Sequence, residues 1–106
     1  MAYIELPLSH DTPHQSFSVQ LDGSVYQVRL RYNSRAGHWA MDLSDAGGHP
    51  LTVGIAVRLG VDLLAQYSAA IFPPGVLFAL NWTDQYQEPD RDNLGSDVSL
   101  IYEEAL

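Results

Sequence analysis

The residues best suited to chemistry in this chain are its four histidines, because imidazole is the commonest protein ligand of transition metals. His10 and His14 have the i, i+4 spacing that places two ligands on one face of a helix. Pro13 lies between them, however, and no helical periodicity surrounds the pair. His38 and His49 also read as polar residues of turns. We therefore expect no metal site and no cofactor.

An acidic stretch late in the chain begins like a calcium-binding loop. Asp90 and Asp92 are two positions apart, and Gly95 occupies the sixth position, where such loops need a sharp turn. Leu94 stands at the fifth position in place of an oxygen ligand, and Ile101 stands at the twelfth in place of the bidentate glutamate. We interpret the stretch as a solvated acidic turn that ends at the glycine.

The chain lacks the residue groupings that catalysis requires. Cysteine is absent, which excludes disulfides, a thiolate nucleophile and a cysteine-based zinc site. No nucleophile elbow, phosphate-binding glycine loop or serine triad spacing occurs, and the carboxylates are scattered over turns. We predict that the protein is not an enzyme.

Acidic residues dominate the charge of the chain. Thirteen acids against five bases give a formal net charge of -8, which repels a phosphate backbone. Every base is an arginine, a residue type enriched in protein interfaces where lysine is depleted. The bases are Arg29, Arg31, Arg35, Arg58 and Arg91. The composition predicts protein partners and no direct nucleic-acid binding.

The amino-terminal stretch MAYIELPLSHDTPH has no cationic leader and no long apolar run. No apolar stretch approaches the roughly 20 residues that span a bilayer. We expect synthesis in the cytosol, a soluble product and no membrane contact.

Apolar and polar residues alternate along most of the chain, which predicts half-buried β-strands. These strands must position the histidines and acidic residues described above. Asp22-Gly23 separates two alternating stretches and is typical of a type I′ hairpin turn, and residues 46–50 predict a second turn. The predicted inward rows in this half are Phe17, Val19 and Leu21; Tyr26, Val28, Leu30 and Tyr32; Trp39, Met41 and Leu43; and Val53, Ile55, Val57 and Leu59.

The second half of the chain adds two further strands. Asp62 could cap a short helix or turn near residues 61–67, before prolines end it. The later inward rows are Phe78, Leu80 and Trp82, then Val98, Leu100 and Tyr102, with an acidic loop over 83–95 between them and an edge strand over 3–6 at the start. The pattern predicts one all-β domain over residues 1–106. We expect a small antiparallel sandwich or partly open barrel of about seven strands in meander order.

Large aromatic residues divide into two groups. Trp39 and Trp82 fall on the apolar rows of strands, so we expect both in the core. Tyr67, Phe72 and Tyr86 lie outside the predicted strands and are candidates for exposed anchors.

The loop 33–37 is interpreted as architecture, with Asn33 favouring the turn and Trp39 anchoring the returning strand. Arg35 projects from this turn, and we expect it to pair with Asp42 or Asp45, or with a carboxylate across a subunit contact.

A set of weak motifs occurs in fixed order between Tyr32 and Tyr102, within a longer match from Gln15 to Glu103. They are Tyr32-Asn33-x-Arg35-x-x-x-Trp39-x-x-Asp42-Leu43, Gly48-x-x-Leu51-x-x-Gly54, Gly60-x-Asp62-Leu63-Leu64, Pro74-Gly75-x-Leu77, Pro89-x-Arg91-Asp92-Asn93-Leu94-Gly95 and Leu100-x-Tyr102. In this order the sequence resembles the baseplate plug family of contractile-tailed phages and related prophages.

The resemblance implies a structural protein of the virion, a small β protein in the central baseplate of the phage tail that is made in the host cytoplasm. It implies contacts with hub, tail-tube and sheath-proximal proteins, and a homo-oligomer in the assembled tail. The alternative is a ligand- or carbohydrate-binding β module, which the aromatic and acidic loops suggest. The candidate structural and interface residues are Asn33, Arg35, Trp39, Asp62, Tyr67, Tyr86, Arg91 and Asp92.

Overall fold

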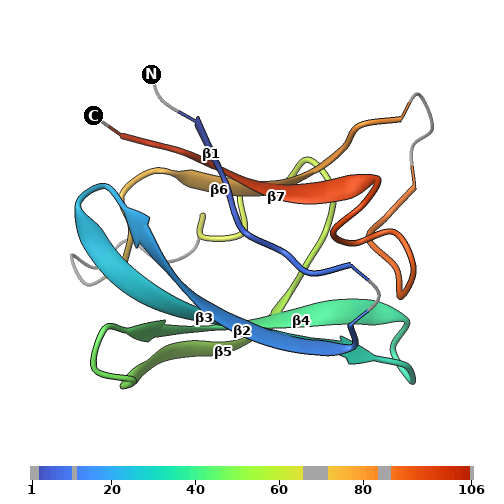
Figure 1. The fold of residues 1–106 in the computed structure, drawn as a ribbon, viewed down its shortest axis with the longest axis horizontal. Helices are drawn as coiled ribbons and strands as arrows, with labels where there is room; N and C mark the ends of the chain where they lie inside the picture. The colour runs from blue at the N-terminus through green and yellow to red at the C-terminus, as the bar shows by residue number, and fades with distance from the viewer. Residues whose placement is uncertain (1–2, 11, 66–71, 84–86, 106) are drawn as a thin grey trace.

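The computed structural model describes residues 3–10, 12–65, 72–83 and 87–105. Within these residues the chain forms strands and no helix, which confirms the all-β prediction. The strands are β1 (Tyr3–Glu5), β2 (His14–Leu21), β3 (Ser24–Asn33), β4 (His38–Asp45), β5 (Pro50–Ala56), β6 (Val76–Asn81) and β7 (Val98–Glu103). They make two antiparallel sheets that lie over one another (Figure 1), so the fold is a sandwich and not a closed barrel.

The larger sheet contains four strands in the order β2-β3-β4-β5, which is the predicted meander. Its first hairpin turns through Asp22 at φ 51° and Gly23 at φ 84°. Positive φ at both central residues is what a type I′ turn requires, and this turn matches the twist of the flanking strands. The inward rows of β3 and β4 are buried as predicted, with Leu30, Met41 and Leu43 each 0% exposed.

The smaller sheet has the order β1-β7-β6, so the first strand pairs with the last. Tyr3 lies opposite Glu103, and Glu5 lies opposite Ile101. The meander is therefore confined to β2 through β5. β7 is the central strand, and both of its faces are buried: Leu100 and Tyr102 are 0% exposed, and Ser99 and Ile101 on the other face are below 10%.

The prediction that Val53 faces the core is wrong, since its side chain is 62% exposed. Met41 pairs with Ile55 and Leu43 pairs with Thr52, so two residues of β5 lie opposite one residue of β4. This bulge reverses the alternation of β5 at Val53. Gly54, at φ 78°, is the second residue of the bulge, and such an inserted residue is not visible in an apolar pattern.

The segment after β5 forms a turn over residues 63–65 and no helix, while residues 66 and 67 of the predicted segment lie outside the described chain. This segment covers the free edge of β6. The amide of Gly60 donates to the carbonyl of Ala79 at 3.1 Å, and the amide of Leu63 donates to the carbonyl of Leu77 at 2.7 Å. The edge of β6 is thereby removed from solvent.

Candidate functional site

β6 carries apolar residues on both of its faces. Leu77 and Ala79 point into the core and are 1% exposed, whereas Val76 and Leu80 point outward and are each 36% exposed. Phe78 lies in the outward row and is half-buried. The predicted phase of this strand is therefore wrong: Phe78 and Leu80 belong to the outside of the sheet. Because both rows are apolar, alternation alone could not choose between them.

Trp82, which was expected in the core, is 59% exposed. Its indole Nε1–H donates to Ser99 Oγ at 2.9 Å, and the Ser99 hydroxyl donates to Glu5 Oε2 at 2.9 Å. The backbone amide of Trp82 also donates to the carbonyl of Asp97 at 2.8 Å. These bonds hold an exposed aromatic side chain in one position before any partner is present, which lowers the entropy cost of using it as an anchor.

We name the outward side of the smaller sheet the outer face. Its residues are Tyr3, Glu5, Val76, Phe78, Leu80, Trp82, Ser99, Ile101 and Glu103. Tyr3 is 63% exposed, and its hydroxyl donates to Glu103 Oε2 at 3.4 Å. Contiguous exposed apolar side chains that include aromatics, flanked by polar groups, are typical of protein interaction surfaces.

A second cluster lies on the outward side of the larger sheet around Asp42, which is 7% exposed. Arg29 Nη2 lies 3.1 Å from Asp42 Oδ2, and Arg31 Nη2 lies 3.0 Å from Oδ1. The amide of Gly54 in the bulge donates to Oδ1 at 2.9 Å. Burial acts to raise the pKa of Asp42, but the hydrogen bonds from Arg31, Gly54 and Arg29 outweigh it and hold this pKa below its usual value.

The sequence predicts that Arg35 pairs with Asp42 or Asp45, or with a carboxylate across a subunit contact. Asp42 is instead bound by Arg29 and Arg31, because Arg29 lies directly opposite it across β3 and β4. Asp45 contacts His49, with 3.3 Å between Oδ1 and Nδ1. Arg35 is exposed and forms no ion pair within the described residues, so the local pairing is wrong and only the subunit contact remains a prediction.

Asn33 has the turn role that its residue type indicated. Its side-chain Oδ1 accepts hydrogen bonds from the amides of Arg35 and Ala36, both at 3.1 Å. Its carbonyl accepts from the amide of Gly37 at 2.8 Å. The loop between β3 and β4 is thus closed by its own first residue, and it presents Arg35 to solvent.

Trp39 lies in the core, as predicted, at 1% exposure. Its ring meets that of Tyr32 edge-on, with 5.5 Å between centroids. The indole Nε1–H reaches across to the later acidic turn and donates to the carbonyl of Asp90 at 2.6 Å. The tryptophan therefore connects the larger sheet to the turn that precedes β7.

That acidic turn is held by its own side chains. Asp90 Oδ1 accepts from the amides of Asp92 and Asn93, and Asn93 Oδ1 accepts from the amide of Asp90 at 2.8 Å. A ring nitrogen of His10 lies 2.9 Å from the carbonyl of Asp92, which fastens the turn to the segment between β1 and β2. Arg91 is partly buried in the same turn. These contacts give the turn an architectural role.

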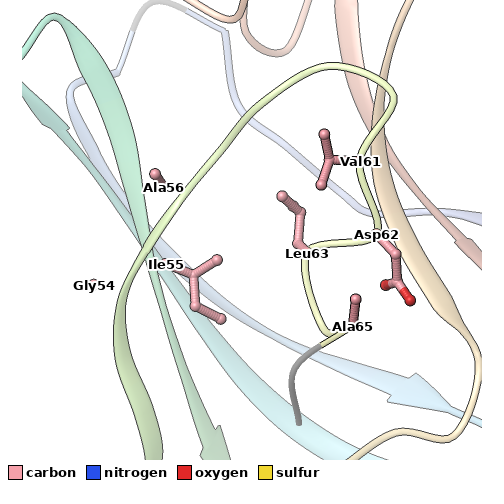
Figure 2. Close-up of a pocket in the computed structure, with 7 residues that line it drawn as sticks. All are labelled: Gly54, Ile55, Ala56, Val61, Asp62, Leu63 and Ala65. Carbon is pink, nitrogen blue, oxygen red and sulfur yellow. The ribbon is translucent and has the colours of Figure 1, made fainter.

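Asp62 organises a turn and does not cap a helix. Its Oδ1 accepts from the amide of Leu64 at 3.1 Å and from that of Leu77 at 3.3 Å. A pocket of about 360 Å³ lies beside it, between β5 and residues 61–65. Figure 2 shows Ile55 and Leu63 on opposite sides of this pocket and the carboxylate of Asp62 pointing away from Ile55. Apart from Asp62, the side chains that line the pocket are apolar.

The three aromatic residues predicted as exposed anchors are Phe72, Tyr67 and Tyr86. Phe72, expected as an exposed anchor, is 9% exposed and belongs to the core. Tyr67 and Tyr86 lie outside the described residues. The part of the chain that the structure describes contains no group of three or more histidine, cysteine or acidic side chains arranged to hold a metal ion.

A family model described as cyanophage baseplate Pam3 plug gp18 matches residues 1–105. The chain belongs to this baseplate plug family. No curated protein matches the sequence. The family assignment agrees with the resemblance carried by the ordered motifs, and it identifies a structural component of a phage tail.

Two glycines in those motifs are required by packing in this baseplate plug. A side chain at Gly75 would overlap the carbonyl of Glu103 and the ring of Tyr102. Gly95 adopts φ 90°, and an added Cβ would lie 3.0 Å from the carbonyl of Ser9. Gly75 lets its loop pack closely against β7, and Gly95 lets the acidic turn pack closely against the segment between β1 and β2. These glycines of the motifs therefore serve the fold. Across the described residues, no helix of the plug has the length and apolarity needed to cross a membrane.

Proposed function

We propose that this plug protein is a virion structural component that assembles with the hub, tail-tube and sheath-proximal proteins of the baseplate after synthesis in the host cytoplasm, and that it forms a homo-oligomer there. The family match over residues 1–105 carries this proposal. The outer face supports it, because it offers apolar and aromatic side chains where a monomer would normally be polar.

The chemistry of the outer face indicates what kind of partner fits it. Trp82 and Tyr3 supply exposed aromatic area, and Glu5 and Glu103 place two carboxylates beside it. A fitting partner has an apolar patch flanked by arginine or lysine side chains. The family match does not favour the alternative of a ligand- or carbohydrate-binding module.

Co-expression with the hub and tail-tube proteins of the same tail tests the proposal. We expect a co-purifying complex by size-exclusion chromatography with light scattering, and density for the plug in the central baseplate by cryo-electron microscopy. A chain that stays separate from every tail protein at high concentration, and is absent from assembled baseplates, would contradict the function.

A further inference from the structure

The two sheets have four edges, and within the described residues three of them are protected against further pairing. β1 has only three residues, the edge of β6 is covered by residues 59–63, and β5 begins at Pro50 and is interrupted by its bulge. β2 differs from all three. It has eight residues and pairs with β3 without interruption from His14 to Leu21. An uninterrupted edge strand is a template for pairing with another strand.

The register identifies which backbone groups of β2 are free. The pair Leu21–Ser24 closes a two-residue turn, and the amide of Tyr32 donates to the carbonyl of Pro13 at 2.9 Å. In an antiparallel pair, bonded and non-bonded positions alternate, so the odd-numbered residues of β2 bond to β3. The N–H and C=O groups that point away from β3 belong to His14, Ser16, Ser18 and Gln20, and no hydrogen bond reaches them from the described chain.

The side chains of β2 also lack the devices that normally prevent edge pairing. The strand HQSFSVQL contains no charged residue and no proline, although the whole chain has a net charge of -8. Phe17 and Val19 point toward the core and are only half-buried. A neighbouring strand with its own apolar row would complete their cover.

We propose that β2 of a second copy of this chain pairs with β2 in antiparallel orientation, about a two-fold axis at Phe17. This proposal deepens the proposed function by naming how copies of the plug associate. Centred there, His14 lies opposite Gln20 of the second copy and Ser16 lies opposite its Ser18. In both copies, the N–H and C=O groups that point away from β3 then form hydrogen bonds with the other copy. Phe17 faces Phe17 of the second copy in a non-bonded pair, where side chains approach most closely.

The charge of β2 itself does not oppose a second copy at this place. Two chains of net charge -8 repel each other, but β2 brings no carboxylate of its own to the contact. The charged residues nearest to β2 on the neighbouring strand are Arg29 and Arg31, which lie opposite Ser16 and His14 and are already bound to Asp42. A strand that alternates apolar residues with polar ones matches the half-buried row of β2, and β2 itself has this pattern without any charge.

Cysteine cross-linking tests the arrangement cleanly, because the natural chain contains no cysteine. Under oxidation, Phe17→Cys is expected to give a disulfide-linked dimer, since the two Cβ atoms would lie about 5 Å apart. Val19→Cys is the matched control, because it lies in the same half-buried row. The two cysteines at position 19, one in each copy, would be separated by four residues along the strand, or about 13 Å, and should stay unlinked. Equal linking of both variants, or of neither, would overturn the proposal.

A proline on the free edge gives an independent measurement that does not depend on cysteine. The amide of Ser18 points away from β3, so Ser18→Pro removes a donor that the single chain does not use. We expect dimer formation by light scattering to weaken at least tenfold, with an unchanged circular dichroism spectrum, and Ser18→Ala to behave as the natural protein. An unchanged mass for Ser18→Pro, or a natural protein that is monomeric at high concentration or forms open chains, would contradict the two-fold pairing. Retained binding of Ser18→Pro to baseplate proteins would show that the proposed function stands without it.

Discussion

The hydroxyl of Tyr102 donates to Asp22 Oδ2 at 2.5 Å, although the two residues are 80 positions apart. Tyr102 lies in the central strand of the smaller sheet, and Asp22 lies in the first hairpin turn of the larger one. The same phenolic oxygen accepts from the amide of Gly75 at 2.7 Å, and the amide of Ala105 donates to the Asp22 carboxylate. One hydrogen-bonded cluster thus connects both sheets at this end of the sandwich.

Removal of this hydroxyl should weaken the fold while keeping the ring in the core. Tyr102→Phe is expected to lower the free energy of unfolding by about 1–3 kcal/mol, because the partly buried amide of Gly75 and the Asp22 carboxylate lose a partner. Urea denaturation followed by fluorescence measures the change. Tyr3→Phe, at an exposed tyrosine, is the control, and an equal loss in both variants would contradict the special role of the buried hydroxyl.

The same tyrosine should make stability sensitive to alkaline pH. Burial, followed by the hydrogen bond to Asp22, raises the pKa of Tyr102 above its usual value. In the unfolded chain the phenol loses its proton near pH 10, whereas in the folded chain it stays protonated. Stability from this group is therefore complete below about pH 10 and declines above it. Between pH 8 and 11, the free energy of unfolding should decline less steeply with pH for Tyr102→Phe than for the natural protein. Urea denaturation at each pH measures it.

The acidic turn should depend on the indole nitrogen of Trp39. Trp39→Phe keeps an aromatic ring but leaves the carbonyl of Asp90 without its donor, and it leaves a gap where the larger ring was. We expect a loss of about 1–3 kcal/mol and faster hydrogen exchange in residues 87–95. Exchange that rises equally in β2 and β3 would indicate a general loss of stability and contradict a local connection.

The Asp42 cluster predicts a decline of stability at acidic pH. Its folded pKa lies below that of the unfolded chain, so the stabilising contribution is present above about pH 4 and is lost as pH falls through the lower, folded value. Asp42→Asn should cost about 1–3 kcal/mol at neutral pH and should flatten this acidic decline. Asp97→Asn, at an exposed carboxylate, serves as the control in the same urea titrations.

The outer face predicts a variant that separates binding from stability. Trp82→Ala should change the free energy of unfolding by less than about 1 kcal/mol, because the side chain is largely exposed. Binding to the baseplate partner should weaken at least tenfold, or about 1.4 kcal/mol. Val53→Ala on the other sheet, at similar exposure, should bind normally, and equal binding by both variants in calorimetry would remove Trp82 from the interface.

Most of the larger sheet could be predicted from alternation, because β2, β3 and β4 each have one largely apolar row and one largely polar row. The Asp22-Gly23 turn fixed its first register through the dihedral angles that the pair tolerates. Alternation could not show which row of β6 faces the core, since both of its rows are mostly apolar and one of them faces outward. The apolar row of Phe78, Leu80 and Trp82 is the one signal of an interaction surface in this strand, and alternation alone cannot distinguish it from a row that faces the core.

The Asp42 cluster and the bulge were beyond reach for a different reason. Arg29 meets Asp42 through the pairing of β3 with β4, and a single sequence gives no register for such a pair. The bulge at Gly54 shifts β5 by one residue, which exchanges the two faces without changing the composition of the strand.

The pairing of β1 with β7 has a consequence for biosynthesis. Neighbouring strands of the meander can join as soon as each leaves the ribosome, but Tyr3 meets Glu103 only after nearly 100 further residues have been translated. Contacts between such distant positions form late, because closing a long loop costs entropy before it gains any contact. The smaller sheet of the nascent plug therefore stays unfinished until β7 has been translated, and the apolar strand β6 has no β7 partner before that point.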